Sequence, residues 1–396
     1  MTMSMYYENR DFKLYQGDSF QLLEELEEEV DMIFADPPYF PSKGFTMRSK
    51  GRVKCFDKGE WDKERPLSEI NDFNMKWLAS CRNRLKENGT IWVSGTYHNI
   101  YSVANCMVEL GYKILNIIVW NKPDAPLTLS DYHFNFSAEY IIWARKSKDK
   151  RHYFNNELMT FINGGKRMSD VWNIPTTGLW EKTCGKHPTQ KPLRLLYRII
   201  LASTTEGDLI LDPFAGSCTT GIAANLLGRS FIGCDQSEEF LNLGVARRKE
   251  IDNSINADKL LRKMSETPED IMVIINHARK DLKTKMIETG ICYLRAGDSQ
   301  GSLCVTPGFE RMQYVLLHTA GDDVKMFRLK SKGQFQIWTK ETLEKHGFHP
   351  EHAPYYVVLL FDNTKEIPLS RKINVKERLN TYRARIRPLS DFIGIK

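Results

Sequence analysis

The sequence predicts an α/β protein with an open, mainly parallel sheet flanked by helices, followed by a smaller α+β domain. Up to about residue 250, short β-type runs alternate with helical stretches, which is the pattern of parallel strands joined by helical crossovers. The carboxyl ends of such strands meet at one edge of the sheet, where open α/β sheets bind their ligands. Acidic residues stand just past four of the expected strands, and we expect them along that edge: Asp18, Asp36, Asp212 and Asp235.

The expected elements follow one another in a regular order. A β-type run at 12–15 leads through Gly17 and Asp18 into an acidic amphipathic helix at 20–28. The runs at 114–120 and 140–144 suit a hairpin at a sheet edge. A turn is expected at 86–89, because it contains Asn-Gly. The remaining elements are strands at 31–35, 90–93, 209–211 and 231–233, and helices at 219–227 and up to about 251.

The pattern changes after about residue 255, so we expect a domain at 1–254 and an accessory domain at 255–396. Helices are expected at 257–263 and 268–283, and strands at 312–318 and 355–361. The tail from 365 is strongly basic, which favours DNA contact, although a charge run is often only a solvated face. A dimerisation element and a domain with unrelated chemistry are the alternatives. The tail contains Arg371, Lys372, Lys376, Arg378, Arg383, Arg385 and Arg387.

Composition excludes several classes of protein. The 396 residues are 41% hydrophobic and 27% charged, as in a soluble globular protein. No apolar run approaches the ~20 residues of a membrane span and no signal peptide is visible, so we expect a cytoplasmic location. The eight cysteines form no C-x-x-C pair, and Gly347 and Pro350 interrupt the run His346, His349, His352. We therefore expect reduced thiols and no metal.

The turn Asp36-Pro37-Pro38-Tyr39 closes an apolar run and suits one uncommon reaction, methylation of the exocyclic amino group of a base. That nitrogen is a poor nucleophile because its lone pair is delocalised into the ring. The Asp36 carboxylate and the Pro37 carbonyl could each accept one of its N–H bonds and free the lone pair, while Tyr39 stacks on the flipped base. The four residues alone also fit an ordinary Pro-rich turn.

Two segments suit a nucleotide-like cofactor. Asp212-Pro213-Phe214-Ala215-Gly216-Ser217 lies between a strand and a helix, where glycine lets the backbone approach a ligand. Asp235 follows about 20 residues later, where an acid usually accepts ribose hydroxyls. These features alone also fit a dehydrogenase. In the preceding segment 185–192, Lys191 could face a carboxylate such as the methionine end of S-adenosylmethionine, or lie in a basic turn.

Taken together, the motifs resemble the bacterial amino DNA methyltransferases of the β group, especially the HinfI-type and DpnA-type adenine-N6 enzymes. The resemblance covers roughly residues 10–250, with the catalytic motif first and the cofactor loop last. It implies a circularly permuted, Rossmann-like, seven-stranded sheet that binds S-adenosylmethionine. It rests on the motifs 34–40, Trp92-Val93-Ser94-Gly95, His98-Asn99-Ile100-Tyr101, Asp170-Val171-Trp172, 187–192 and 212–220.

The resemblance also implies roles for single residues. Asp18 would lie at the adenine amino group of the cofactor, Asp235 at the ribose, and Thr189 and Lys191 at the methionine end. The family usually has Gly-Ser-Gly-Thr-Thr where this chain has Cys218 as the third residue, from which we expect reduced cofactor affinity at most. The residues expected to line the cofactor are Asp212, Phe214, Gly216 and Thr219.

Two basic segments are expected to hold DNA. The long connection after the catalytic turn is rich in Lys and Arg, which suits a loop that orders on phosphates, or one that is only solvated. In the segment 145–186, basic and aromatic residues interleave, which suits target recognition. The residues expected to contact DNA are Lys43, Arg48, Lys50, Arg52, Lys54, Lys166 and Arg167.

The function expected from the sequence is transfer of a methyl group to adenine N6 in duplex DNA, by base flipping, in a restriction-modification or orphan system. The partners expected are double-stranded DNA, with a cognate restriction endonuclease and a second copy of the chain as further candidates, and no membrane. Cytosine-N4 methylation is the alternative enzyme, although cytosine enzymes of the group more often have Ser in place of Asp36. A catalytically silent DNA-binding regulator is the alternative of another class.

Overall fold

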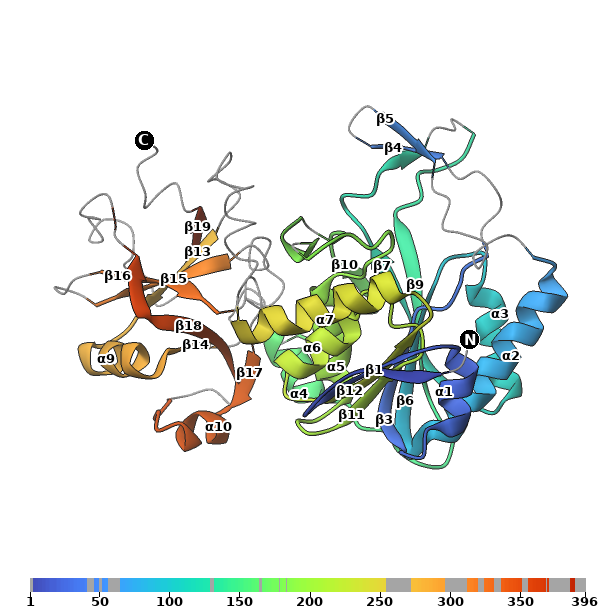
Figure 1. The fold of residues 1–396 in the computed structure, drawn as a ribbon, viewed down its shortest axis with the longest axis horizontal. Helices are drawn as coiled ribbons and strands as arrows, with labels where there is room; N and C mark the ends of the chain where they lie inside the picture. The colour runs from blue at the N-terminus through green and yellow to red at the C-terminus, as the bar shows by residue number, and fades with distance from the viewer. Residues whose placement is uncertain are drawn as a thin grey trace. The chain divides into compact units, whose positions relative to one another are not determined.

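Nine strands of the described residues form one sheet, in the order β1-β2-β12-β11-β3-β6-β9-β7-β10 (Figure 1). Their bounds are β1 Ser4–Asn9, β2 Phe12–Gln16, β3 Val30–Ala35, β6 Leu85–Gly95, β7 Lys113–Asn121, β9 Ala138–Arg145, β10 Val171–Asn173, β11 Leu209–Asp212 and β12 Ser230–Asp235. The computed structural model describes residues 3–40, 46–49, 52–55, 65–128, 132–163, 166–177, 179–182, 184–253, 272–295, 312–319, 324–330, 336–350, 355–367, 369 and 385–388.

The five strands β2, β12, β11, β3 and β6 run parallel, which confirms the expected parallel sheet. Strand β9 runs antiparallel between β6 and β7, so the expected hairpin of β7 and β9 is also confirmed. That hairpin is not at the edge, because β10 pairs with the outer side of β7. With β10 at one end and the β1–β2 hairpin at the other, the sheet has two strands more than the resemblance implies.

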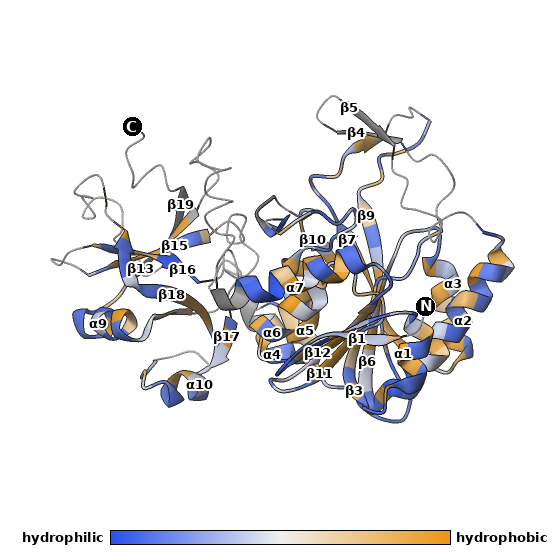
Figure 2. Ribbon diagram, in the orientation of Figure 1, coloured by the Kyte–Doolittle hydropathy of each residue, from blue (hydrophilic) through white to orange (hydrophobic). Residues whose placement is uncertain are grey.

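Helices cover both faces of the sheet because successive strand residues point to opposite sides. Ile33 and Ala35 share a core with α1 (Ser19–Glu25), α2 (Leu67–Arg84) and α3 (Ile100–Glu109). On the other face, Trp92 Nε1 donates to Ser203 Oγ at the end of α5 (Leu193–Ser203). Helix α6 (Thr219–Leu226) lies beside α5, and α7 (Glu238–Asn253) follows β12. Figure 2 shows α5 and α6 as largely hydrophobic.

The turn expected at 86–89 is wrong, since these residues belong to β6. Val30 pairs with Leu85, and the register then shifts before Met32 pairs with Thr90. Lys86 Nζ lies 2.7 Å from Asp31 Oδ1 on the neighbouring strand. An irregularity in the pairing therefore accommodates the Asn-Gly pair without ending the strand.

A separate three-stranded sheet joins β5 (Arg52–Cys55), β4 (Thr46–Ser49) and β8 (Leu127–Thr128) in that order. Met47 pairs with Lys54 on one side and with Thr128 on the other. The backbone of the basic segment after the catalytic turn is thus tied to the connection between β7 and β9.

Two compact units are present. The first contains Met1–Asn156, Met168–Glu181 and Gly185–Val245. The second contains Glu157–Arg167, Lys182–Cys184 and Ala246–Lys396. The short helices α4 (Asn156–Ile162) and η2 (Leu179–Lys182) fall at these boundaries.

The second unit has its own sheet, in the order β14-β18-β16-β15-β13-β19, with β17 also paired to β18. The strands expected at 312–318 and 355–361 are confirmed as β15 and the first part of β18. The helix expected at 268–283 is wrong over 272–277, where an apolar run forms β13 against β15. The helix expected at 257–263 lies outside the described residues. The bounds are β13 Met272–His277, α9 Lys280–Thr289, β14 Ile291–Arg295, β15 Met312–His318, β16 Lys325–Leu329, β17 Gln336–Thr339, α10 Lys340–Lys345, β18 Tyr355–Ile367 and β19 Arg385–Pro388.

None of the helices in the described ranges is long and apolar enough to cross a membrane. In the same ranges, no group of three or more His, Cys, Asp or Glu side chains is arranged to hold a metal ion.

Candidate active site

The four acids expected at one edge of the sheet do lie there. Asp212 and Asp235 end β11 and β12, Asp36 directly follows β3, and Asp18 follows β2 by two residues. Because these strands are mutually parallel, their carboxyl ends share one edge. The N–H of Gly17 donates to the carbonyl of Asp235 over 3.2 Å, which ties two of the strand ends together.

The turn after β3 is held tightly. The hydroxyl of Tyr39 donates to Asp36 Oδ1 at 2.5 Å and lies 3.0 Å from Ser94 Oγ on β6. Phe40 has a φ of +50°, a backbone conformation that is costly for an aromatic residue, and its ring packs edge-on against Phe73. This strain is stored directly beside the catalytic turn.

Asn99 holds the same turn through a hydrogen bond. Its side-chain amide donates to the carbonyl of Pro38 at 3.4 Å and accepts from the N–H of Thr96. Asn99 is fully buried, and a Cβ at Gly95 would lie 2.6 Å from its Oδ1. Glycine at the end of β6 therefore makes room for the residue that positions Pro38.

An ion-pair network surrounds Asp36. Lys191 Nζ donates to Asp36 Oδ2 and lies 3.8 Å from Glu139 Oε2. The other oxygen of Glu139 pairs with Lys122 Nζ at 2.9 Å, and Glu139 Oε2 lies 3.4 Å from the Tyr39 hydroxyl. Lys191 is buried and the other charged groups are half-buried, and their charges alternate in sign.

Burial lowers the pKa of Lys191, but the carboxylates of Asp36, Glu139 and Asp212 outweigh it and raise the pKa above its ordinary value. Lys191 is therefore a cation at neutral pH. Burial, followed by the charges of Asp36 and Glu139, raises the pKa of Tyr39 well above its ordinary value. Tyr39 is therefore a neutral hydrogen-bond donor to Asp36.

Asp212 shapes the loop that leads into α6. Its carboxylate accepts from the N–H of Phe214 at 3.0 Å and from the hydroxyl of Thr220 at 2.5 Å. Burial raises the pKa of Asp212 to about 7, against the lowering effect of these two hydrogen bonds. Thr219 is buried in the first turn of α6, and Phe214 is half-buried with its ring edge-on to Trp77.

Gly216 lies close to Asp235 on one side and to His187 on the other. Its N–H donates to Asp235 Oδ2 at 2.9 Å, so the loop is fastened to the end of the next strand. A Cβ at Gly216, which has a φ of +51°, would lie 3.0 Å from His187 Nε2. This contact brings the segment with Thr189 and Lys191 against the loop of Asp212, as a shared cofactor site requires.

Cys218 occupies a position that needs a left-handed backbone, with a φ of +58°. Its side chain is fully buried, and a Cβ at Gly244 of α7 would lie 2.3 Å from its Sγ. The loss of the usual glycine is thus accompanied by a glycine on the helix opposite, which provides the space for the thiol. The strain of such a residue is roughly 1 kcal/mol or more.

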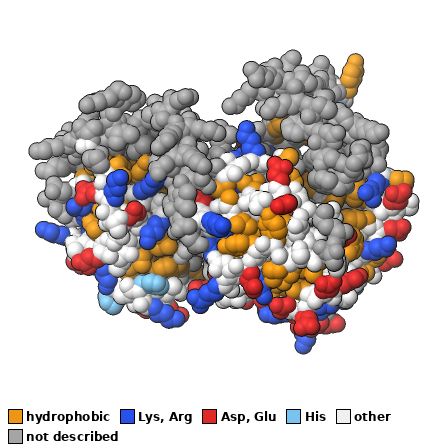
Figure 3. Space-filling view, viewed as in Figure 1, with side chains coloured by type: hydrophobic (Ala, Val, Ile, Leu, Met, Phe, Trp, Pro, Cys, Tyr) orange, Lys and Arg blue, Asp and Glu red, His pale blue; other side chains and the backbone are white. Residues whose placement is uncertain are grey.

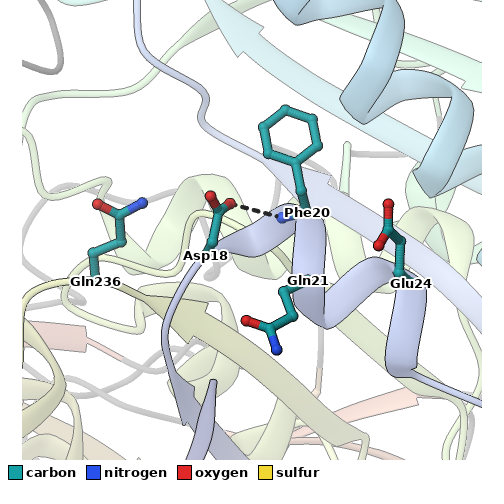
Figure 4. Close-up of a pocket in the computed structure, with 5 residues that line it drawn as sticks. All are labelled: Asp18, Phe20, Gln21, Glu24 and Gln236. Atoms are coloured by element: carbon teal, nitrogen blue, oxygen red, sulfur yellow. Dashed lines mark hydrogen bonds between the residues drawn. The ribbon is translucent and has the colours of Figure 1, made fainter. Parts of the chain in front are cut away.

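A cavity of about 420 Å³ opens beside Asp18 (Figure 4). It is lined by Asp18, Phe20, Gln21, Glu24 and Gln236, and its volume suits a small-molecule ligand. Asp18 Oδ1 caps α1 by accepting from the N–H of Phe20 at 3.0 Å. Gln236 directly follows Asp235, so the cavity adjoins the acid expected at the ribose.

Glu139 and Lys122 were not expected at the site, and no role had been assigned to Ser94 or Asn99. Glu139 stands at the start of β9, where strand position alone would place it away from Asp36. Because β9 runs antiparallel, its start lies at the carboxyl edge of the other strands. A lone acid before the apolar run 140–144 was the available signal, but its use required the direction of the strand.

Of the residues expected to contact DNA, Lys43 and Lys50 lie outside the described residues. Arg48 lies on β4, and Arg52 and Lys54 lie on β5. Lys166 and Arg167 are exposed, and their carbonyls accept from the side-chain amide of Asn163.

The fold and the site define a class: an α/β methyltransferase with a permuted sheet, whose catalytic turn precedes its cofactor loop in the chain. The chain belongs to the DNA methylase family, whose profile matches residues 30–246. The resemblance to bacterial amino methyltransferases is therefore confirmed.

Two Type II methyltransferases agree with this assignment, and one solved structure is similar to part of the chain. The Type II methyltransferase M2.MboI of Moraxella bovis is 50% identical over 254 residues, which are 63% of this chain and 93% of the relative. The Type II methyltransferase M.HinfI of Haemophilus influenzae is 35% identical over 255 residues, 63% of this chain and 71% of the relative. The crystal structure of the M1.HpyAVI–SAM complex is 27% identical, with a TM-score of 0.47, over 60% of this chain and 98% of that one.

Proposed function

We propose that the protein transfers a methyl group from S-adenosylmethionine to the N6 amino group of a flipped adenine in duplex DNA. Membership of the DNA methylase family supports the class of reaction. The observation that carries the proposal is the half-buried carboxylate of Asp36 just after β3, oriented by Tyr39 and charge-balanced by Lys191. Such a fixed acceptor is what activation of an aromatic amino group requires.

In this proposal Asp36 and the Pro37 carbonyl accept the two N–H bonds of the amino group. A carboxylate has about four acceptor positions, so Asp36 can take a further hydrogen bond beside those from Tyr39 and Lys191. The bond from Asn99 to Pro38 holds the second proline of the turn in place. As the nitrogen gains a methyl group it loses a proton, and Asp36 is the base that faces it.

S-adenosylmethionine supplies an electrophilic methyl group when it is bound. The residues present fit this molecule: Asp235 would accept the ribose hydroxyls, Asp18 and Gln236 line the adjoining cavity, and Gly216 would permit close approach of the backbone. Asp212, Phe214 and Thr219 form the loop and helix start around it. Thr189 is half-buried beside His187 and is proposed for the methionine end together with Lys191.

Lys191 has two roles in this proposal. Its ammonium group neutralises Asp36, and it also lies in the segment that His187 anchors against Gly216. It therefore stands between the catalytic turn and the cofactor loop. A carboxylate at the methionine end would meet the same cation.

Asp36 favours adenine over cytosine, because the resemblance associates Ser with cytosine-N4 enzymes at this position. The same geometry could nevertheless polarise either amino group, so cytosine N4 is the second candidate. The two cases share the fold, the cofactor site and the flipped base.

DNA binding is proposed for the basic strands β4 and β5 and for Lys166 and Arg167. On the face drawn in Figure 3, the described Lys and Arg side chains are scattered among Asp and Glu. The net charge of +6 is also modest, so local contacts rather than a strong overall field would hold the DNA. A cognate restriction endonuclease and a second copy of the chain are further proposed partners, and the cytoplasm is the proposed location.

The test is incubation with unmethylated bacterial DNA and tritiated S-adenosylmethionine, followed by digestion and separation of the nucleosides. Label in N6-methyldeoxyadenosine is the expected result. Label in N4-methyldeoxycytidine would change the proposed target base from adenine to cytosine. No label, with intact cofactor binding, would overturn DNA as the substrate. Calorimetry without any heat of cofactor binding would favour a silent DNA-binding regulator.

A further inference from the structure

Exposed aromatic side chains gather at the edge of the sheet that carries Asp36. Phe134 is 96% exposed and Tyr132 is 99% exposed, both in the connection between β7 and β9. Phe136 of the same connection stacks on Tyr97, with ring centroids 5.3 Å apart and planes 16° from parallel. Tyr97 comes from the turn after β6, so two separate segments build this surface.

The β7–β9 connection, which carries most of the aromatic surface, is joined at its base to the ion-pair network around Asp36. The connection between β7 and β9 is closed at its base by the N–H of Lys122, which donates to the carbonyl of Ser137 at 2.7 Å. Lys122 Nζ pairs with Glu139, whose other oxygen lies beside the Tyr39 hydroxyl. Few residues thus separate the base of the aromatic surface from the turn that holds Asp36.

Two strands whose sequences contain Lys and Arg lie next to the same connection. Strand β8 lies within it and pairs with β4, with the backbone of Arg48 opposite Leu127 in register. Strand β5, with Arg52 and Lys54, pairs with the other side of β4. The pairing of β4 with β8 thus places the backbone of basic residues next to the connection that carries Tyr132, Phe134 and Phe136.

We propose that Tyr97, Tyr132, Phe134 and Phe136 form a base-stacking surface that enters the duplex beside the target adenine and keeps it open. Planar rings suit nucleobases, because every base offers a π-face for stacking. Apolar side chains inserted between base pairs offset the unstacking that extrusion of a base requires. This inference rests on the proposed function and adds to it the surface that stabilises the opened DNA.

The test compares Phe134→Ala and Phe136→Ala with wild type on two duplexes of one sequence, built around a site mapped from labelled genomic DNA. In one duplex the target adenine is paired, and in the other it faces an abasic position and is already unpaired. We expect kcat/KM to fall about 10- to 100-fold on the paired duplex and to return to within about threefold of wild type on the abasic duplex.

Val108→Ala is the matched control. Val108 is 65% exposed, between the 37% of Phe136 and the 96% of Phe134, but it lies in the last turn of α3 and in no proposed binding segment. We expect this variant to match wild type on both duplexes. Calorimetric cofactor affinity should be unchanged in all variants, which shows that the site is folded.

Three results would overturn the inference while leaving the proposed function in place. They are equal loss on both duplexes, no loss on either, and a change of sedimentation that marks the surface as a contact between copies of the chain. A wild-type protein that methylates neither duplex would instead overturn the proposed function itself.

Discussion

Asp36 carries the proposed chemistry, and its ion pair with Lys191 joins residues 155 positions apart in the chain. An asparagine at this position keeps the size of the side chain but replaces one acceptor oxygen by a donor. It also leaves Glu139 as the nearest remaining carboxylate for Lys191, at 3.8 Å. The variant therefore removes an acceptor oxygen from the reacting group, while Lys191 keeps a carboxylate partner.

We expect Asp36→Asn to lower the rate of methyl transfer by about 100- to 1,000-fold, because a fixed acceptor at the reacting group is lost. Cofactor affinity should stay within a few fold of wild type. Single-turnover transfer and calorimetry measure the two quantities.

Asp31→Asn is the matched control for this variant. Asp31 is also 18% exposed and ion-paired to a lysine, but it lies at the opposite end of β3. Asp31→Asn should retain activity. Asp36→Asn with activity near wild type would contradict the mechanism.

Asp212 makes stability depend on pH. Its pKa of about 7 lies above the ordinary 3.8, so between these values the folded state keeps a proton that the unfolded state releases. Stability should therefore fall as pH rises from about 4 to 7 and level off above. Asp212→Asn should remove this part of the slope, at most about 4 kcal/mol, in urea unfolding at pH 5 and pH 8. Equal slopes in both proteins would show that Asp212 is ionised throughout.

At the scale of elements, the loop before α6 packs against helix α7 where Cys218 meets Gly244. We expect Gly244→Ala to destabilise the protein by about 1–3 kcal/mol, because the new Cβ would lie 2.3 Å from the thiol. Cys218→Gly alone should be close to neutral, since relief of the left-handed backbone offsets the cavity that the thiol leaves.

The double variant Cys218→Gly with Gly244→Ala should recover most of the stability lost in Gly244→Ala. Urea unfolding of the four proteins gives the coupling between the two positions. Additive effects would mean that the two elements do not contact as described.

The sequence pattern predicts most of the elements of the first unit but only part of the site. Alternation of strands and helices predicted the parallel sheet, and positions just past strand ends predicted the edge shared by Asp18, Asp36, Asp212 and Asp235. Glu139 could not be found in this way, because its place depends on β9 running against its neighbours. The sequence predicts a helix over 272–277 where the structure has a strand, since a short apolar run has no periodicity that separates the two until its pairing with β15 is known.

At the scale of the whole molecule, the family profile ends at residue 246, so the proposed catalytic unit and the accessory segment can be tested apart. We propose that residues 255–396 contact DNA through their basic tail. Their deletion should lower DNA affinity and reduce the slope of log affinity against log salt.

Equilibrium binding at several salt concentrations measures that slope. Retained cofactor affinity in the truncated protein is the control for folding of the remaining residues. An unchanged slope would show that residues 255–396 are not a DNA-binding element.

The permuted strand order has a consequence during synthesis. Strand β3 pairs with β6 on one side and with β11 on the other, and β11 leaves the ribosome long after both. At about 5–20 residues per second, the chain between the end of β3 at Ala35 and the start of β11 at Leu209 takes roughly 10–35 s to make. For that time the apolar edge of β3 is unpaired in the nascent chain, and it is the segment on which a chaperone would act or from which aggregation would start.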